Sequence, residues 1–246
     1  KPLENSNVEV DIYLPEHRLA IEINGEYWHS EQYRRGRTYH IDKQKALENQ
    51  GIRTLQFWGS EVDVKKPVIG SMLRSRLGLL KNSVGARKCV VVTPTLEETK
   101  DFLDKNHLQG NVPYHKSFGL KFENVLVAVL TTGRPRFNDS VDWEILRFAV
   151  NRNFAVQGGF SKLLKATRAV LTGSYITYAD RRYSVGNVYR QSGFQFSRMT
   201  PPSYFYVKGG VAISRYRTQK HKLPKLLGEL FDSSKSEKEN MTTAGY

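Results

Sequence analysis

The sequence predicts a mixed α/β (α+β) protein with two folded domains. Its 246 residues are enough to bury a sizeable core and to form two domains. Apolar and polar residues alternate at residues 8–14, and strand-like and helix-like stretches follow one another from there. Turn-forming and charged residues at 80–88 favour a boundary at that point. We therefore expect domains at residues 1–85 and 86–223, followed by a polar C-terminal tail at residues 224–246.

The chain is strongly basic, which narrows the partners that we expect for it. Lys and Arg number 38 against 24 Asp and Glu, a formal net charge of +14. Such an excess favours polyanions, with nucleic acid first and an anionic membrane surface second. No apolar run approaches the roughly 18 residues that span a bilayer, and no signal-peptide core is present. The single cysteine, Cys89, excludes a disulfide framework and a cysteine-rich zinc site, so a cytosolic, reducing compartment fits.

The first domain reads as a hairpin, a helix, a strand and a second helix. Residues 8–14 have the period of a half-buried strand, residues 15–18 form a turn, and residues 19–23 are again extended. An amphipathic helix is expected at residues 39–50, with Gly51 as its C-terminal stop. Residues 52–58 form the next strand, and residues 67–80 form a helix behind it.

Two acidic residues interrupt the apolar hairpin strands. Asp11 and Glu22 lie on neighbouring strands, where ionised carboxylates are costly unless they are paired or bound to a cation. Two converging acids could hold a hard divalent metal, most plausibly Mg²⁺. Two plainer readings remain open: Asp11 could be an edge-strand acid that meets solvent, and Glu22 could form a salt bridge with Arg18.

The first domain resembles the PD-(D/E)xK nuclease superfamily, in particular very-short-patch-repair-like nucleases and phage-encoded homing endonucleases. The resemblance is carried by Asp11, by the segments IEING and YWHSE at residues 21–25 and 27–31, and by YH, Lys43 and GIR at residues 39–40, 43 and 51–53. It implies a restriction-endonuclease-like core in which Asp11 and Glu22 bind Mg²⁺ and water attacks a phosphodiester.

The resemblance also raises the question of which residue supplies positive charge. The family's usual Lys lies two positions after the Glu, and this sequence has Asn24 there. His29, His40 and Lys43 are the candidates for proton transfer or charge stabilisation. The two on the helix could equally belong to a solvated face, and His29 could be a packed, hydrogen-bonded histidine.

The second domain reads as a mixed sheet with helices. We expect a strand at 89–93, a helix at 94–106 capped by Thr95, and a hairpin of residues 118–122 and 125–132 around Glu123-Asn124. A strand at 143–150 precedes Gly158-Gly159, which open a helix. A strand at 175–179, a short helix at 184–192 and a strand beginning at 194–197 follow.

This order resembles the acyl-CoA N-acyltransferase (GNAT) fold, in the variant of phage Mom-type DNA-modification proteins. The segments that carry the resemblance are WEILRFAVNRNFAVQGGFSKLLKA and YADRRYSVGNVYRQSGFQ. In that fold a glycine-rich turn at a helix N-terminus binds the cofactor's pyrophosphate. The corresponding cofactor-binding candidates are Gln157, Gly158, Gly159 and Ser161, which keep part of the family's pattern. The turn could instead bind nothing, or it could hold a DNA phosphate.

Basic residues alternate with tyrosines in the second domain, a composition that suits phosphate contacts and occasional stacking on bases. Arg215 and Arg217 are expected to alternate along a strand. Together with three arginines of the first domain, the DNA-binding candidates are Arg34, Arg35, Arg37, Arg134, Arg136, Arg181, Arg182, Arg215, Arg217 and Lys220.

We therefore expect a Mg²⁺-dependent, site-specific DNA endonuclease of the homing type, whose GNAT-like domain positions double-stranded DNA. One alternative is a Mom-like acyltransferase that modifies DNA bases with acyl-CoA; another is a DNA-binding protein with a degenerate nuclease core. A homodimer would be needed for a symmetric double-strand break unless one subunit acts twice. The resemblance implies the cytoplasm of a phage-infected bacterium, no membrane partner, and an upstream segment that carries another acidic residue.

Overall fold

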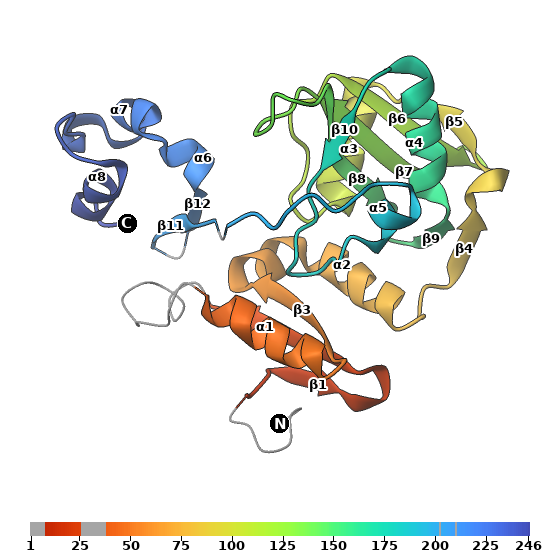
Figure 1. Cartoon of the computed structure of the whole chain (residues 1–246), viewed down its shortest axis with the longest axis horizontal. Coiled ribbons are helices and arrows are strands. Elements are labelled where there is room, and N and C mark those ends of the chain that lie inside the picture. Colours follow the sequence, from red (N-terminus) through yellow and green to blue (C-terminus); the bar gives the residue numbers. More distant parts are fainter. Residues whose placement is uncertain (1–7, 26–37, 202, 210) are drawn as a thin grey trace. The chain divides into compact units, whose positions relative to one another are not determined.

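The computed structural model describes residues 8–25, 38–201, 203–209 and 211–246, and it is a mixed α/β structure (Figure 1). The chain divides into two compact units. Unit 1 comprises Lys1–Val64 and Ser197–Tyr246, and unit 2 comprises Lys65–Phe196. The domain boundaries expected from the sequence stay a prediction. Among the described residues, no helix has both the length and the apolar composition that crossing a membrane requires.

Unit 1 contains a three-stranded sheet with the order β1-β2-β3. The short strand β1 (Ile12–Leu14) runs antiparallel to β2 (Leu19–Asn24), which runs parallel to β3 (Arg53–Trp58). Helix α1 (Tyr39–Asn49) lies against this sheet, where Leu47 joins Ala20 and Ile52 in a small core. Gly51 follows the C-cap Gln50 with a φ of +70°, which confirms the predicted stop.

The remaining elements of unit 1 come from the C-terminal part of the chain. Strands β11 (Phe205–Lys208) and β12 (Val211–Ser214) form an antiparallel hairpin. Residues 224–246, predicted as a polar tail, include the buried Met241 on a helix that Ser236 and Glu239 cap reciprocally. The helices of this part are α6 (Arg215–Thr218), α7 (Leu223–Leu227) and α8 (Glu237–Thr243), with 3₁₀ helices at Lys220–Lys222 and Gly228–Leu230.

Unit 2 is built on a five-stranded mixed sheet with the order β10-β8-β7-β6-β5. The expected hairpin is confirmed as β6 and β7, with Glu123 and Asn124 at positive φ in its turn. Strand β10 runs parallel to β8, whereas the other neighbours are antiparallel. The strands are β5 (Val90–Val92), β6 (Lys116–Phe122), β7 (Val125–Gly133), β8 (Trp143–Val150) and β10 (Tyr175–Thr177).

Helices α3 (Leu96–Asn106) and α4 (Gly159–Val170) bury their apolar sides against the sheet of unit 2 (Figure 1). Thr95 and Glu98 cap α3 reciprocally, which confirms the predicted N-cap. A separate parallel pair, β4 (Asn82–Gly85) with β9 (Phe154–Gln157), leads into α4. The unit also contains the short helix α5 (Asn187–Gln191). Helix α2 (Gly59–Arg76) runs from unit 1 into unit 2 and has non-helical φ and ψ at Lys65.

Two local predictions were wrong. Residues 194–197 form no strand, and the described residues between them and β11 are irregular. Arg215 and Arg217 lie on helix α6 instead of alternating along a strand. In both places the sequence pattern was short, and a run of a few aromatic or alternating residues does not separate a strand from an irregular segment or a helical turn.

Gly119 gives a test of packing in unit 2. A Cβ at this position would lie 2.7 Å from Pro94 Cγ and 2.8 Å from Leu126 Cδ1. We expect Gly119→Ala to lower the free energy of unfolding by about 1–3 kcal/mol, because the close-packed neighbours must move. Gly85 is the matched control, since a Cβ there meets nothing within 4 Å and its φ is −75°. Urea unfolding followed by circular dichroism measures both, and equal effects of the two substitutions would contradict the packing described here.

Candidate active site

Asp11, just before β1, and Glu22, in the central strand β2, lie beside each other at one end of the β1–β2 pairing. Ile12 pairs with Ile21 across β1 and β2, so the next pair outward in this register is Asp11 and Glu22. Directly opposite residues of an antiparallel pair share a face of the sheet. The Asp11 carboxylate also accepts a hydrogen bond from the backbone N–H of Ile23 at 2.7 Å. The structure thus brings together the two acids that the sequence proposed as metal ligands.

Glu22 is a buried carboxylate with one cationic partner. Its residue surface is 6 % exposed, and Lys43 Nζ from α1 donates to Oε2 at 2.5 Å. Burial raises the pKa of Glu22 above its ordinary value; the hydrogen bond and charge of Lys43 act in the opposite direction, and the charge of Asp11 adds to the rise. The other oxygen, Oε1, is buried with no hydrogen-bond partner among the described residues. Glu22 therefore pairs with Lys43, and the expected alternative partner, Arg18, is not used.

Arg18 has a different role. Its guanidinium donates to the backbone carbonyls of Gln50 and Gly51, at the C-terminal end of α1. These carbonyls lack helical partners, and an arginine at this end of a helix also interacts favourably with the helix dipole. The turn between β1 and β2 is thereby fastened to α1, which positions the helix that carries Lys43.

A line of amides extends the site along the interface between the sheet and α1. Asn24 Nδ2 donates to Gln56 Oε1 at 3.3 Å, and Gln56 Nε2 donates to Gln44 Oε1 at 3.3 Å and to the His40 carbonyl at 3.4 Å. Gln44 in turn donates to Glu48 at 2.8 Å. Asn24, Gln44 and Gln56 are all buried. Asn24 is thus a neutral amide in a hydrogen-bonded network, and the nearby positive charge comes from Lys43.

Gln44 and Gln56 were missed by the sequence analysis. Gln56 interrupts the apolar strand Leu55-Gln56-Phe57 as Glu22 interrupts β2, and it lies beside Glu22 in the parallel register of β2 and β3. A buried polar side chain within an apolar strand was therefore the available signal. Gln44 gave no such signal, because it lies on a helix of mixed composition.

Of the two histidine candidates, only His40 belongs to the part of the chain that the structure describes. His40 makes edge contacts with the rings of Tyr39, at 5.3 Å between centroids, and Trp58, at 6.1 Å. Trp58 pairs with Asn24 in the register of β2 and β3, which places His40 near the amide end of the site. His29 lies outside the described residues, as do Arg34, Arg35 and Arg37.

The chemistry of this donor set can be compared with the needs of a metal. Among the described residues, no group of three or more His, Cys, Asp and Glu is placed to hold a metal ion. Mg²⁺ needs fewer protein ligands than that, since it is usually bound through one or two carboxylates with waters and substrate phosphates. The unsatisfied Glu22 Oε1 is an oxygen of the required kind, and Asp11 lies opposite it. These residues fit a hard divalent cation.

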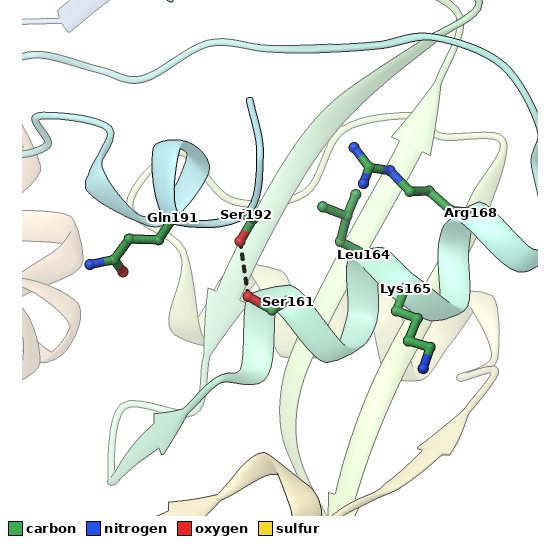
Figure 2. A pocket seen from close by; sticks show the side chains of 6 residues that line it. All are labelled: Ser161, Leu164, Lys165, Arg168, Gln191 and Ser192. Carbon is green, nitrogen blue, oxygen red and sulfur yellow. Dashed lines mark hydrogen bonds between the residues drawn. The ribbon is translucent and has the colours of Figure 1, made fainter. Parts of the chain in front are cut away.

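The predicted cofactor turn lies in unit 2, at the start of α4. Gly158 adopts a left-handed conformation (φ +74°) as the N-cap, and Gln157 donates to Ser83 Oγ at 3.4 Å. Figure 2 shows the adjacent pocket of about 320 Å³, in which Ser161 and Ser192 point toward each other at 2.9 Å between their Oγ atoms. The lining residues are Ser161, Leu164, Lys165, Arg168, Gln191 and Ser192.

The described DNA-binding candidates are divided between the two units. Arg134, Arg136, Arg181 and Arg182 belong to unit 2, whereas Arg215, Arg217 and Lys220 belong to unit 1. Two of them have their charge engaged within unit 2: Arg136 pairs with Glu144, and Arg182 pairs with Asp180 at 2.9 Å. Arg215 lies over the ring of Tyr204, with 5.1 Å from its Cζ to the centroid.

The raised pKa of Glu22 predicts a pH dependence of stability. Between its ordinary value of 4.5 and the higher folded-state pKa, the folded protein holds a proton that the unfolded chain has lost. The contribution of Glu22 to stability is therefore complete below about pH 4.5 and is lost as the pH rises through the folded-state pKa. In Glu22→Gln this loss is absent. Urea unfolding at a series of pH values measures it, with Glu9→Gln as an exposed control; parallel profiles for wild type and Glu22→Gln would contradict it.

Comparisons with known proteins add no further assignment. No family model matches the chain, and neither the curated proteins nor the solved structures gave a match.

Proposed function

We propose that the protein is a metal-dependent, site-specific DNA endonuclease of the homing type that hydrolyses phosphodiester bonds. The observation that carries the proposal is the buried Glu22, which has one oxygen paired with Lys43 and the other unsatisfied, opposite Asp11. A protein gains nothing in stability from a buried carboxylate oxygen without a partner, because such a group keeps its full desolvation cost. A cation that binds this oxygen accounts for it.

Asp11 and Glu22 are the residues that would hold the metal. A divalent cation bound there supplies Lewis-acid polarisation of the phosphoryl oxygen and lowers the pKa of a bound water. The resemblance also predicts a further acidic residue upstream, and no described residue tests that prediction. Mg²⁺ is the preferred ion because both candidate ligands are carboxylates, which are hard oxygen donors.

Lys43 takes the role that the family gives to the lysine two positions after the Glu. It reaches the site from α1 and not from β2, and its ammonium donates a hydrogen bond to Glu22. An ammonium at this position favours the ionised form of Glu22 and can stabilise negative charge that develops on a phosphate. Asn24, Gln56 and Gln44 fix the relative position of β2, β3 and α1, so they are positioning residues.

The distribution of charge supports DNA as the substrate. Unit 2 contains 21 Lys and Arg against nine Asp and Glu, a net charge of +12, whereas the rest of the chain carries only +2. A domain of this charge attracts a polyanion at long range and makes its affinity strongly salt-dependent. We therefore propose that unit 2 binds and positions DNA for cleavage by unit 1.

The proposal predicts the effect of substitutions in the site. Asp11→Ala and Glu22→Ala should abolish Mg²⁺-dependent cleavage of phage-sized double-stranded DNA while DNA binding persists. Lys43→Met should slow cleavage by about 10²–10³-fold, which is typical for the loss of one charge-stabilising donor. The controls are Glu9→Ala, an exposed residue that precedes β1, and Lys45→Met, an exposed residue of α1. Mapping the DNA ends with Mg²⁺ and with EDTA gives the readout.

Cleavage that survives in Glu22→Ala would overturn the proposed metal site. DNA binding without cleavage by the wild type would favour a DNA-binding protein with a degenerate nuclease core.

A second candidate function follows from the pocket beside the α4 turn. Ser161, Arg168 and Ser192 offer hydroxyl and guanidinium donors of the kind that bind a pyrophosphate, and Ser161 lies in the first turn of α4, which begins at Gly159. The second candidate function is the acyl-CoA-dependent modification of DNA bases, in which unit 2 would be the catalytic unit. The Lys165 side chain extends away from the serine pair, so it adds charge to the rim of the pocket and not to its centre (Figure 2).

Calorimetry with acetyl-CoA tests the second candidate. If it is correct, acetyl-CoA binds the wild type, and Arg168→Ala weakens the affinity by about tenfold, because hydrogen bonds to charged groups contribute about 1.5–3 kcal/mol. Arg190→Ala is the control, since this exposed arginine of α5 does not line the pocket. The absence of heat at high protein concentration would remove this candidate and leave the nuclease proposal unaffected.

A further inference from the structure

The loop that joins β7 to β8 in unit 2 presents an aromatic ring to solvent. Phe137 is 75 % exposed, and its ring meets that of Tyr178 edge-on, with 6.0 Å between centroids and 87° between planes. Tyr178 follows β10 and is itself 37 % exposed. The guanidinium of Arg136 lies 5.6 Å from the centre of the Phe137 ring. Two exposed rings and a cation thus form one surface on this unit.

This loop is fastened at both ends, so the ring is presented in a defined position. At the first end, the fully buried Glu144 accepts from the Arg136 backbone N–H at 2.9 Å and from its Nε at 3.1 Å, and also forms an ion pair with its guanidinium. At the other end, Asp142 accepts from the backbone N–H and the hydroxyl of Ser174, each at 2.7 Å. A ring held in this way loses little conformational freedom when a ligand binds to it.

A second aromatic group lies at the base of the same loop. Trp143 stacks on His115, with 5.2 Å between centroids and 26° between planes, and Arg134 lies 5.7 Å from the centre of its ring. Each end of the Arg134-Pro135-Arg136-Phe137 segment therefore combines a guanidinium with a ring. The carboxylates of Glu144 and Asp142 are engaged as described, and Asp180 pairs with Arg182; Asp139 is an exposed acid within the loop.

We propose that Phe137 and Tyr178 form a stacking site for an unpaired nucleic-acid base, with the exposed Arg134 placed to contact an adjoining phosphate. The proposal rests on the function proposed above, in which DNA is the substrate, and it adds the structural class of DNA that unit 2 holds. Bases inside a duplex already stack on their neighbours, so an aromatic side chain gains a base only where the strand is single or the base is extruded. The net charge of +12 on unit 2 favours a polyanion over a protein partner of mixed charge.

Binding of the full-length chain to labelled oligonucleotides in EDTA tests the proposal without any cleavage. The probes are a fluorescent single strand of about 12 nucleotides and the blunt duplex of the same sequence, compared by anisotropy. Phe137→Ala should weaken binding to the single strand by about tenfold or more, the expected loss of stacking on one base, and should change duplex binding less than twofold. Phe137→Trp should retain single-strand binding. Phe196→Ala, which removes another exposed ring of unit 2 (64 % exposed), is the matched control and should change neither.

Three results would overturn the proposal. These are failure of the wild type to bind the single strand, unchanged single-strand binding by Phe137→Ala, and an equal loss on both probes. Unchanged binding would point instead to a protein partner for the exposed ring. Thermal melting verifies that Phe137→Ala is folded, as its exposure leads us to expect. The binding assay needs neither metal nor Glu22. A negative result for the stacking site can therefore be distinguished from the absence of the proposed nuclease activity.

Discussion

The ion pair between Glu22 and Lys43 is the interaction on which the arrangement of the candidate active site depends. It joins the central strand β2 to helix α1 across an interface that is otherwise held by amides and a few aliphatic side chains. Two buried charges lose their hydration, and their attraction compensates for that loss only when the remaining polar atoms are also satisfied. Here one oxygen of Glu22 stays unsatisfied. The unsatisfied oxygen therefore reduces what the pair can contribute to stability, and it agrees with the cation site proposed above.

The amides around this pair follow from the same constraint. A wholly apolar contact between α1 and the sheet would bury area without fixing the axial position of the helix, whereas Asn24, Gln56 and Gln44 are satisfied only in one register of β2, β3 and α1. Buried polar networks can specify a unique arrangement in this way at some cost in stability. Arg18 adds a second fastening at the far end of the helix. The ammonium of Lys43 is consequently held opposite β2 to within the tolerance of a hydrogen bond.

The sequence predicted local structure better than it predicted partners. Helix α1, the β6–β7 hairpin, the α3 cap and strand β8 were all expected, because periodicity, turn chemistry and capping are local properties. The pairing of Glu22 with Lys43 and not Arg18 was not foreseen, since 21 residues separate the partners and the register of α1 on the sheet decides between them. Gln56 was overlooked for a related reason: a glutamine in a strand becomes informative only when its neighbours in space are known. The charge of the chain was evident from composition, but its concentration in residues 65–196 became meaningful only with the division into units.

The separation of basic charge from the two acidic residues bears on the proposed nuclease activity. A carboxylate pair that must hold a divalent cation repels a polyanion, so strong DNA attraction cannot be built into the same few residues without neutralising the metal ligands. Placing a net charge of +12 on unit 2 and only +2 on the rest of the chain avoids this conflict. The attraction of unit 2 to DNA phosphates then acts over about a Debye length. The contacts of the proposed metal site act only over a few ångströms. Salt should therefore weaken the capture of DNA far more than it weakens the buried Glu22–Lys43 pair, whose charges lie mostly beyond the reach of solvent ions.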